Sequence, residues 1–235
     1  MCADDAPWAA GLMERRRQQY ARYSPVFWRP AQGVTPLHAR FLRRQISAGN
    51  IVAVRTGHGF LIAGRRGGEG FVDDFAVDAE GTWDGDGAAL LLAAAHRLAA
   101  AGGVGAMRVV TAHADVAKAG MLRRLSLSLA EQWWVLPVRP TGQMTSPGRV
   151  QGGGFPGILG PAPPVYDPGG PVFQPDRVAD GADVALIARE AAALGAVLAV
   201  VAAAPGSALS AGLRGQGWSI ASDWYLGWPA SAHGH

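Results

Sequence analysis

Two neighbouring aspartates lie inside an apolar stretch of the sequence, FVDDFAV at residues 71–77. Aromatic and β-branched residues in a run of this length predict a strand, whose side chains alternate between two faces. Asp73 and Asp74 are therefore expected on opposite faces, unless a bulge changes the alternation. Because a carboxylate among apolar residues is costly, one of them is expected to do acid–base chemistry; the alternative is a hydrogen-bonded structural aspartate.

Other side chains able to move a proton are spread along the chain. His113 follows a predicted strand and is the third catalytic candidate, His58 lies in a predicted hairpin turn, and Glu131 and Tyr166 are weaker candidates. The sequence contains no His-x-x-x-His pattern and no acidic calcium loop, and Cys2 is its single cysteine. These patterns predict no metal site and exclude an intrachain disulfide.

The residues after the aspartate strand form a glycine-bearing loop, TWDGDG at 82–87, followed by a long apolar helix. A strand, a glycine loop and a helix N-terminus make an anion site, because backbone amides point at the ligand. This loop carries Asp84 and Asp86 but no Arg or Lys. These carboxylates either lie against a bound phosphate and repel it, or they interact favourably with the helix dipole without contacting a ligand.

The composition is that of a folded, well-packed chain. Hydrophobic residues make up 49% and charged residues 17% of 235 residues. No apolar run reaches the roughly 18 residues of a membrane-spanning helix, and no secretory leader pattern is present, so a cytoplasmic protein is expected. Arginines cluster near the N-terminus, at 15–17, 22, 40, 43 and 44. They form either a solvated helix face or a patch for an anionic cofactor or nucleic acid.

The order of predicted elements is two helices, an antiparallel meander and a β-α-β-α-β run, which makes a mixed α/β sheet and not a doubly wound parallel one. The expected helices are 8–23, a second helix beginning at Thr35-Pro36 and ended by Gly49-Asn50, 85–101 and 115–125, and the expected strands are 51–56, 59–64, 71–77, 106–112 and 127–138.

The segment 141–171 is dominated by glycine and proline, which predicts a linker or a long surface loop without regular structure. The rest of the chain repeats what precedes it. Residues 109–138 align without gaps on 200–229, a constant offset of 91 that pairs Val109 with Val200 and Leu122 with Leu213. Such self-similarity predicts a duplicated half-domain. The expected division is a domain at 1–140, a linker at 141–171 and a degenerate, non-catalytic half-domain at 172–235 that lacks a full meander and a glycine loop.

On these residues the stretch 35–138 resembles the GCN5-related N-acetyltransferase (GNAT) superfamily. The family shares an [RQ]-x-x-G-x-[GA] loop between a strand and a helix, which falls here on Thr82–Gly87, with Val77 at the end of the strand. Asp115 falls on the family's usual Asn, and Leu122 falls on the Tyr that often acts as general acid. Thr82 departs from the usual Arg or Gln.

The resemblance implies an N-acyltransferase in which acetyl-CoA or another acyl-CoA is the donor and a small-molecule amine attacks its thioester directly. A backbone amide near a β-bulge would polarise the carbonyl, and Asp73 is the first choice as base, before Asp74 and His113. A monomer or a homodimer without a membrane partner is expected. The residues implied to hold the CoA are Phe75, Val77, Thr82, Trp83, Asp84, Gly85, Asp86, Gly87 and Ala88.

Two other functions fit the same residues. Tandem GNAT-like lobes resemble ligases that take an aminoacyl group from tRNA, and the acidic loop and the arginine-rich helices would suit such a donor. Alternatively, the chain is a non-catalytic binding module that keeps the GNAT fold without the catalytic residues.

Overall fold

The computed structural model describes residues 1–142, 145–151 and 154–230. Within this part, contacts divide the chain into two compact units. Unit 1 comprises Met1–Gln19, Gly33–Leu129 and Trp224–His235, and unit 2 comprises Tyr20–Gln32 and Ala130–Asp223. The division cuts through one helix and two strands, so it does not follow the boundaries 1–140, 141–171 and 172–235 expected from composition.

Unit 1 is built on a four-strand arrangement in the order β1-β2-β3-β4. The first two pairings are antiparallel and β3 runs parallel to β4. Its elements are a short 3-10 turn at Ala3–Asp5, α1 (Ala6–Tyr23), α2 (Val34–Ala48), β1 (Val52–Arg55), β2 (Gly59–Arg66), β3 (Glu69–Val77), a π-helical turn at Trp83–Gly87, α3 (Ala88–Ala100), β4 (Ala106–Ala112) and α4 (Val116–Arg124).

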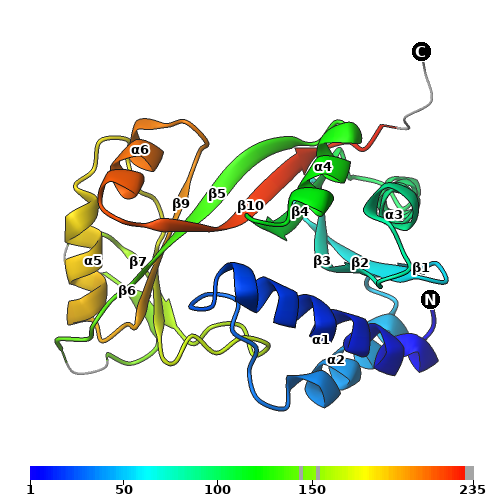
Figure 1. Ribbon diagram of the computed structural model, residues 1–235, viewed down its shortest axis with the longest axis horizontal. Coiled ribbons are helices and arrows are strands. Elements are labelled where there is room, and N and C mark those ends of the chain that lie inside the picture. Colours follow the sequence, from blue (N-terminus) through cyan, green and yellow to red (C-terminus); the bar gives the residue numbers. More distant parts are fainter. Residues whose placement is uncertain (143–144, 152–153, 231–235) are drawn as a thin grey trace. The chain divides into compact units, whose positions relative to one another are not determined.

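The strands of unit 1 bury side chains on both faces. Leu61 and Ala63 of β2 pack with α3 and α4 in one cluster, whereas Phe60 and Ile62 pack with α1 and α2 in another. Figure 1 shows α3 on one side of β1–β3 and α1 and α2 on the other. This two-sided burial explains why β2 reads as a continuous apolar run.

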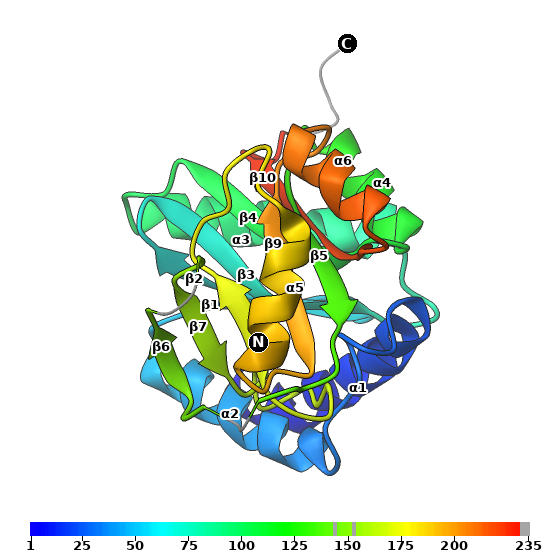
Figure 2. The same cartoon turned by 90° about the vertical axis from the view of Figure 1, so that its left-hand side faces the viewer.

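Unit 2 has the same arrangement. Its meander β6-β7-β8 is antiparallel, and β8 runs parallel to β9. Its elements are β6 (Gly148–Val150), β7 (Gly157–Gly160), β8 (Val172–Pro175), α5 (Val184–Ala193), β9 (Leu198–Ala203), α6 (Ala208–Gly215) and the larger parts of β5 (Ser128–Pro137) and β10 (Ser219–Gly227). Helix α5 lies against these strands (Figure 2), where Ile187 and Ala191 join Phe173 and Val201 in an apolar core.

The strand that completes each arrangement comes from the other half of the sequence. Strand β5 follows unit 1 along the chain, yet it pairs antiparallel with β9, from Gln132 opposite Ala203 to Pro137 opposite Leu198. Strand β10 ends the chain's second half, yet its residues Trp224–Gly227 belong to unit 1, and β10 is next to β4 in the strand order. The two copies of the repeat have therefore exchanged their last strands.

The gap-free repeat corresponds to equivalent elements. Shifting β4, α4 and β5 by 91 residues gives stretches that coincide with β9, α6 and β10 to within one residue at each end. Ser126 and Gly217, which correspond in the repeat, both have a left-handed backbone, with φ of 66° and 78°. The mixed α/β fold class is thus as expected.

Two expectations about the second half are wrong. The segment 141–171 does form regular structure, since β6 and β7 lie within it; residues 143–144 and 152–153 of this segment are outside the described part. The second copy does not lack the meander either, because β6, β7 and β8 supply it. Strands of three or four residues leave too short a pattern to stand out between glycines and prolines.

The remaining boundaries differ little from those expected, except at the start of α3. The predicted helix at 85–101 begins as the π-helical turn Trp83–Gly87 and becomes α-helical at Ala88. In the described part of the chain, no helix combines the length and the hydropathy needed to cross a membrane.

Candidate acyl-transfer site in unit 1

A β-bulge interrupts β3 at the aspartate pair. Ile62 of β2 lies opposite Asp74, but its neighbour Ala63 lies opposite Val72, so Asp73 has no partner in β2. The extra residue changes the alternation of side chains. Val72 and Phe75 both face the α3 side of the strand, and Asp74 is directed to the other side.

Strand β3 parts from β4 at the same point. The parallel pairing runs from Glu69 opposite Ala106 to Val72 opposite Val109 and goes no further in the described structure. The carboxyl-terminal halves of the two strands are therefore not joined to each other by a ladder. Carboxyl ends of adjacent parallel strands that separate in this way leave room for a ligand in open α/β sheets.

The glycine loop is held by its own residues. The hydroxyl of Thr82 accepts a hydrogen bond of 2.9 Å from the amide of Gly85, and its carbonyl accepts one of 3.0 Å from the amide of Gly87. A Cβ on Gly85 would lie 2.8 Å from the Thr82 hydroxyl, and one on Gly87 would lie 2.7 Å from the Trp83 ring. Both glycines are thus required by the turn itself, whatever it binds.

The acidic charge of the loop is met by an arginine from another element. Asp84 accepts from Arg124 at the end of α4, with 3.1 Å from Nε to Oδ1 and a second contact through Nη2. Both side chains are more than half exposed, so the pair adds little stability. The pair matters for position: Arg124 of α4 places a guanidinium beside the loop, whereas the loop itself has Thr82 where the family has Arg or Gln. Asp86 is half-buried.

The other residues implied to hold the donor divide between core and loop. Phe75 and Trp83 are buried and pack edge to face, with ring centroids 4.9 Å apart. Val77 and Ala88 are half-buried beside the same apolar cluster. These four residues shape the apolar base of the loop.

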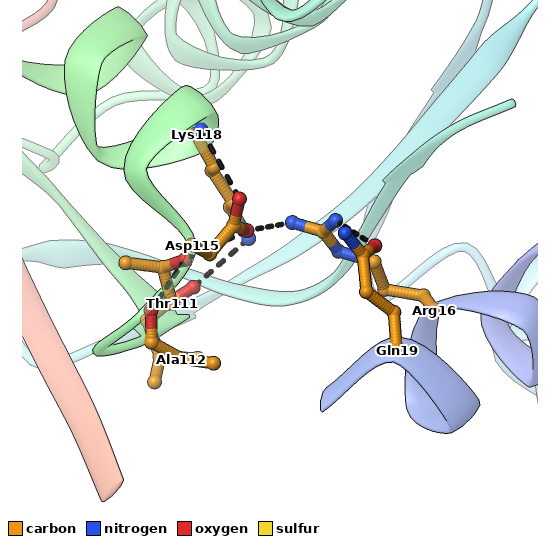
Figure 3. A network of polar contacts seen from close by, with 7 residues as sticks. Arg16, Gln19, Thr111, Ala112, Asp115 and Lys118 are labelled. Carbon is orange, nitrogen blue, oxygen red and sulfur yellow. Dashed lines mark hydrogen bonds and ion pairs between the residues drawn. The ribbon is translucent and has the colours of Figure 1, made fainter. Parts of the chain in front are cut away.

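A buried polar network lies where β3 and β4 separate (Figure 3). Asp115, the N-cap of α4, accepts from the Lys118 amide and forms an ion pair with Arg16 of α1. The Thr111 hydroxyl donates to the same carboxylate over 3.1 Å, and Gln19 accepts from Arg16 over 2.7 Å. Arg16 also lies 4.8 Å from the centre of the Trp83 ring, which ties the network to the glycine loop.

Lys118, the chain's single lysine, is 3% exposed. Its Nζ donates to the carbonyl of Val110 over 2.9 Å and lies 4.9 Å from the centre of the Phe75 ring. The side chain thus reaches from α4 to a main-chain carbonyl of β4 and an aromatic ring of β3, past the point where their pairing ends.

A second buried chain of polar groups leads to Asp74. Arg17 of α1 contacts Nδ1 of His38 at 3.0 Å, and Nε2 of His38 contacts Oδ2 of Asp74 at 2.8 Å. Arg17, His38 and Asp74 are 1%, 4% and 8% exposed. Asp74 is thus a buried carboxylate that two helices hold on the face of β3 opposite Phe75.

Asp73 has a different environment. Partial burial at the bulge raises the pKa of the Asp73 carboxyl, the Arg66 guanidinium at 3.4 Å opposes this rise, and the Asp74 carboxylate adds to it. Since 44% of the Asp73 side chain is exposed, solvent screens much of these effects.

The remaining proton-moving candidates are placed as follows. His58 is half-exposed and lies 3.5 Å from Asp78. Burial raises the pKa of the Asp78 carboxyl, but the hydrogen bonds from the Gly81 and Glu80 amides have a larger opposite effect, so this pKa is below its usual value. His113 follows β4 and is exposed. Glu131 accepts from the Trp133 indole, and Tyr166 packs on Trp28; both belong to unit 2.

Sequence reasoning missed six residues of these networks: Arg16, Arg17, Gln19, His38, Thr111 and Lys118. Arg16 and Arg17 were counted with a basic surface cluster, but they are 7% and 1% exposed. Their helical spacing from buried Leu12, Met13 and Tyr20 was an available signal. In the described part of the chain, no three His, Cys, Asp or Glu side chains gather in a way that could hold a metal ion.

Comparison with protein-family models and with curated protein sequences gives no match. Solved structures do match. A GCN5-related N-acetyltransferase from Kribbella flavida superposes with a TM-score of 0.52 at 12% identity, covering 96% of this chain and 69% of that one. A protein from Thermoplasma acidophilum assigned as an acetyltransferase gives 0.51 at 11% identity, covering 89% and 87%. With the bulge, the glycine loop and the order of elements in unit 1, these matches show that the chain has the GCN5-related N-acetyltransferase fold.

Proposed function

We propose that this chain is an N-acyltransferase that moves an acetyl or another acyl group from acyl-CoA to an amine of a small molecule. The observation that carries the proposal is the bulge at Asp73, placed where β3 leaves β4 and on the strand that leads into the glycine loop. On this proposal, β3 supplies the site for the carbonyl and the carboxylate beside it, and the turn that follows supplies the anion site.

The glycine loop suits the diphosphate of the donor. The loop stands at the start of α3, where a helix N-terminus favours an anion, and Gly85 and Gly87 add no side chain there, although their amides donate to Thr82 within the turn. Asp84 forms a salt bridge with Arg124, which offsets the negative charge of its carboxylate. The same guanidinium would attract the diphosphate. Thr82, Gly85, Gly87 and Arg124 are the residues proposed to hold this group.

The reaction needs a neutral amine and a polarised carbonyl. A backbone amide at the bulge polarises the thioester carbonyl, since Asp73 has no partner in β2. A carboxylate takes a proton from the acceptor's ammonium group, and the amine nitrogen attacks the carbonyl carbon. The carbon–sulfur bond then breaks, and the second proton of the nitrogen passes to the departing CoA thiolate, which leaves the amide and the CoA thiol. Of the two aspartates we assign the proton transfer to Asp74, because it is buried and oriented, whereas Asp73 is exposed beside Arg66.

The direct test is donor binding followed by transfer. Calorimetry with acetyl-CoA should show binding, and Arg124→Ala should weaken it about five- to tenfold, the range of one charge-assisted contact. Arg189→Ala is the matched control, because Arg189 also forms an exposed pair with an aspartate, Asp183, in unit 2. Thiol release with a panel of amines then reports transfer. No binding of acetyl-CoA or longer acyl-CoAs at millimolar concentration would overturn the proposal.

The same test separates the alternatives. Transfer from aminoacyl-tRNA was suggested by the arginine-rich helices, but Arg16 and Arg17 are buried and so contribute no surface charge. Salt-sensitive tRNA binding without acyl-CoA binding would favour it nonetheless. A non-catalytic module would bind acyl-CoA and release no thiol with any amine.

A further inference from the structure

The contact between Arg17 and His38 defines the state of the histidine ring. A guanidinium has only donors and does not lose its proton in proteins, so the ring nitrogen facing it must accept. Nδ1, at 3.0 Å from Arg17 Nη2, therefore carries no hydrogen. The neutral ring then carries its hydrogen on Nε2, which faces Oδ2 of Asp74 at 2.8 Å and donates to it. Both contacts of the ring are satisfied by one tautomer and by no other.

This arrangement also distinguishes the two oxygens of Asp74. Oδ2 is occupied by His38, and the described residues give Oδ1 no hydrogen-bond partner, while 11% of the side chain is exposed. Asp74 is thus fixed at one oxygen and has no protein partner, among the described residues, at the other. It also stands next to the bulge residue Asp73, where the reacting carbonyl is proposed to lie.

We infer that His38, locked by Arg17 in its Nε2–H tautomer, is a positioning residue that aims Oδ1 of Asp74 at the acceptor amine. This inference rests on the proposed function. In the step concerned, one proton passes from the acceptor's ammonium nitrogen to Oδ1, which leaves a neutral amine and a protonated Asp74, and no hydrogen leaves His38. His38 contributes by fixing the carboxylate rotamer, which a buried, hydrogen-bonded side chain does better than a solvated one.

The charge arrangement supports this role over plain packing. A histidine used only to fill space between α2 and β3 would need neither a carboxylate nor a guanidinium in the core, and both are costly to bury. Here the imidazole separates a cation from an anion and hydrogen-bonds to each. The three residues come from α1, α2 and β3, so the whole α1–α2 side of unit 1 must fold before Asp74 is oriented.

The tautomer can be measured without any activity. Nitrogen-15 spectra of the six histidines should contain one ring with an unprotonated Nδ1 and a protonated Nε2, and this ring should be absent from His38→Gln. In Arg17→Met the same ring should lose its single tautomer. A His38 ring that is protonated on Nδ1, or that averages between tautomers in the wild type, would overturn the inference.

Kinetics then tests the positioning role. His38→Ala should lower kcat about 10- to 100-fold with an unchanged KM for the amine, because orientation and not binding is lost. His38→Gln, whose amide nitrogen can still donate to Oδ2, should recover most of this loss. Equal kcat for His38→Ala and the wild type would refute the role. If the wild type itself transfers no acyl group, the proposed function fails and the role of His38 in catalysis fails with it, whereas the tautomer measurement still reports on the buried geometry.

Discussion

From their meanders onward, units 1 and 2 share one order of strands and α-helices, but they differ in what their equivalent positions contain. In unit 1 the third strand carries two aspartates and a bulge, whereas the third strand of unit 2, β8, pairs with β7 without a register shift and reads VFQP. Thr111, Asp115 and Lys118 of unit 1 correspond through the repeat to Ala202, Gly206 and Leu209 of unit 2. The fold requires none of these polar groups, since unit 2 adopts it without them.

The difference indicates where function has been kept. A buried ion pair or lysine costs desolvation energy that packed apolar residues would not. Unit 2 has residues without polar side chains at the equivalent positions, and its Leu209 is buried, with 4% exposed. Unit 1 retains Arg16, Asp115 and Lys118 in its core, and it is also the unit with the bulge and the glycine loop. These buried polar groups support the proposal that unit 1 is the reactive one.

The largest effect is expected from the N-cap of α4. Asp115→Ala removes the cap and leaves Arg16 buried without its carboxylate, which should cost about 3–5 kcal/mol of the free energy of unfolding. Ser207→Ala removes the cap of α6, the equivalent helix of unit 2, and should cost about 1 kcal/mol. Urea unfolding of both variants measures the difference, and equal losses would mean that the Arg16 ion pair contributes nothing.

A smaller effect is expected one turn later in the same helices. Lys118→Met removes a charged donor from the Val110 carbonyl and should destabilise by about 2 kcal/mol. Leu209→Met exchanges one apolar side chain for another and should cost less than about 1.5 kcal/mol. Thermal unfolding distinguishes them; a Lys118→Met variant as stable as the wild type would show that this position tolerates the apolar residue found in unit 2.

The next effect depends on pH. The Arg108 hydrogen bonds, 2.6 and 3.0 Å long, lower the pKa of Glu69 despite partial burial. Because the folded pKa is below the unfolded one, the pair stabilises the fold above the unfolded pKa of about 4.5, and this contribution is lost as pH falls through the lower folded pKa. Glu69→Gln should therefore lower the free energy of unfolding by up to about 1 kcal/mol at pH 7 and leave it unchanged at a pH below the folded pKa of Glu69. In unit 2 the position of Arg108 is taken by Ala199, so an equivalent ion pair cannot form at that position. A loss of stability that stays constant with pH would exclude the pair as its cause.

The smallest effect concerns the turn before the exchanged strands. Ser126 has a φ of 66°, where a Cβ is strained, and Gly217 holds the equivalent place with a φ of 78°. Ser126→Gly should stabilise by a few tenths to about 1 kcal/mol, and Gly217→Ser should destabilise by a similar amount. Denaturation midpoints of the two variants should move in opposite directions, and a shift of the same sign would contradict the equivalence of the two turns.

The sequence predicted much of this fold from local patterns. Helices α1, α2 and α4 and strands β1–β5 were predicted from apolar patterns and the turns between them, and β4 was predicted with its observed bounds, 106–112. The short strands β6 and β7 were missed, because three or four residues among glycines do not establish a period. Of the proposed site, the aspartate pair and the glycine loop were visible as unusual residues in regular elements, whereas His38 was an ordinary residue of an amphipathic helix.

The sequence by itself determined the order of elements, the repeat with its offset of 91 residues and the location of the glycine loop, since each is written in neighbouring residues or in direct self-similarity. Only the tertiary structure decided which copy receives β5, that the bulge falls at Asp73, and that Arg17 and His38 meet Asp74. These outcomes depend on contacts between residues far apart in the chain. Strand pairing and the satisfaction of buried charges are settled when distant segments pack together, and no local pattern records the result.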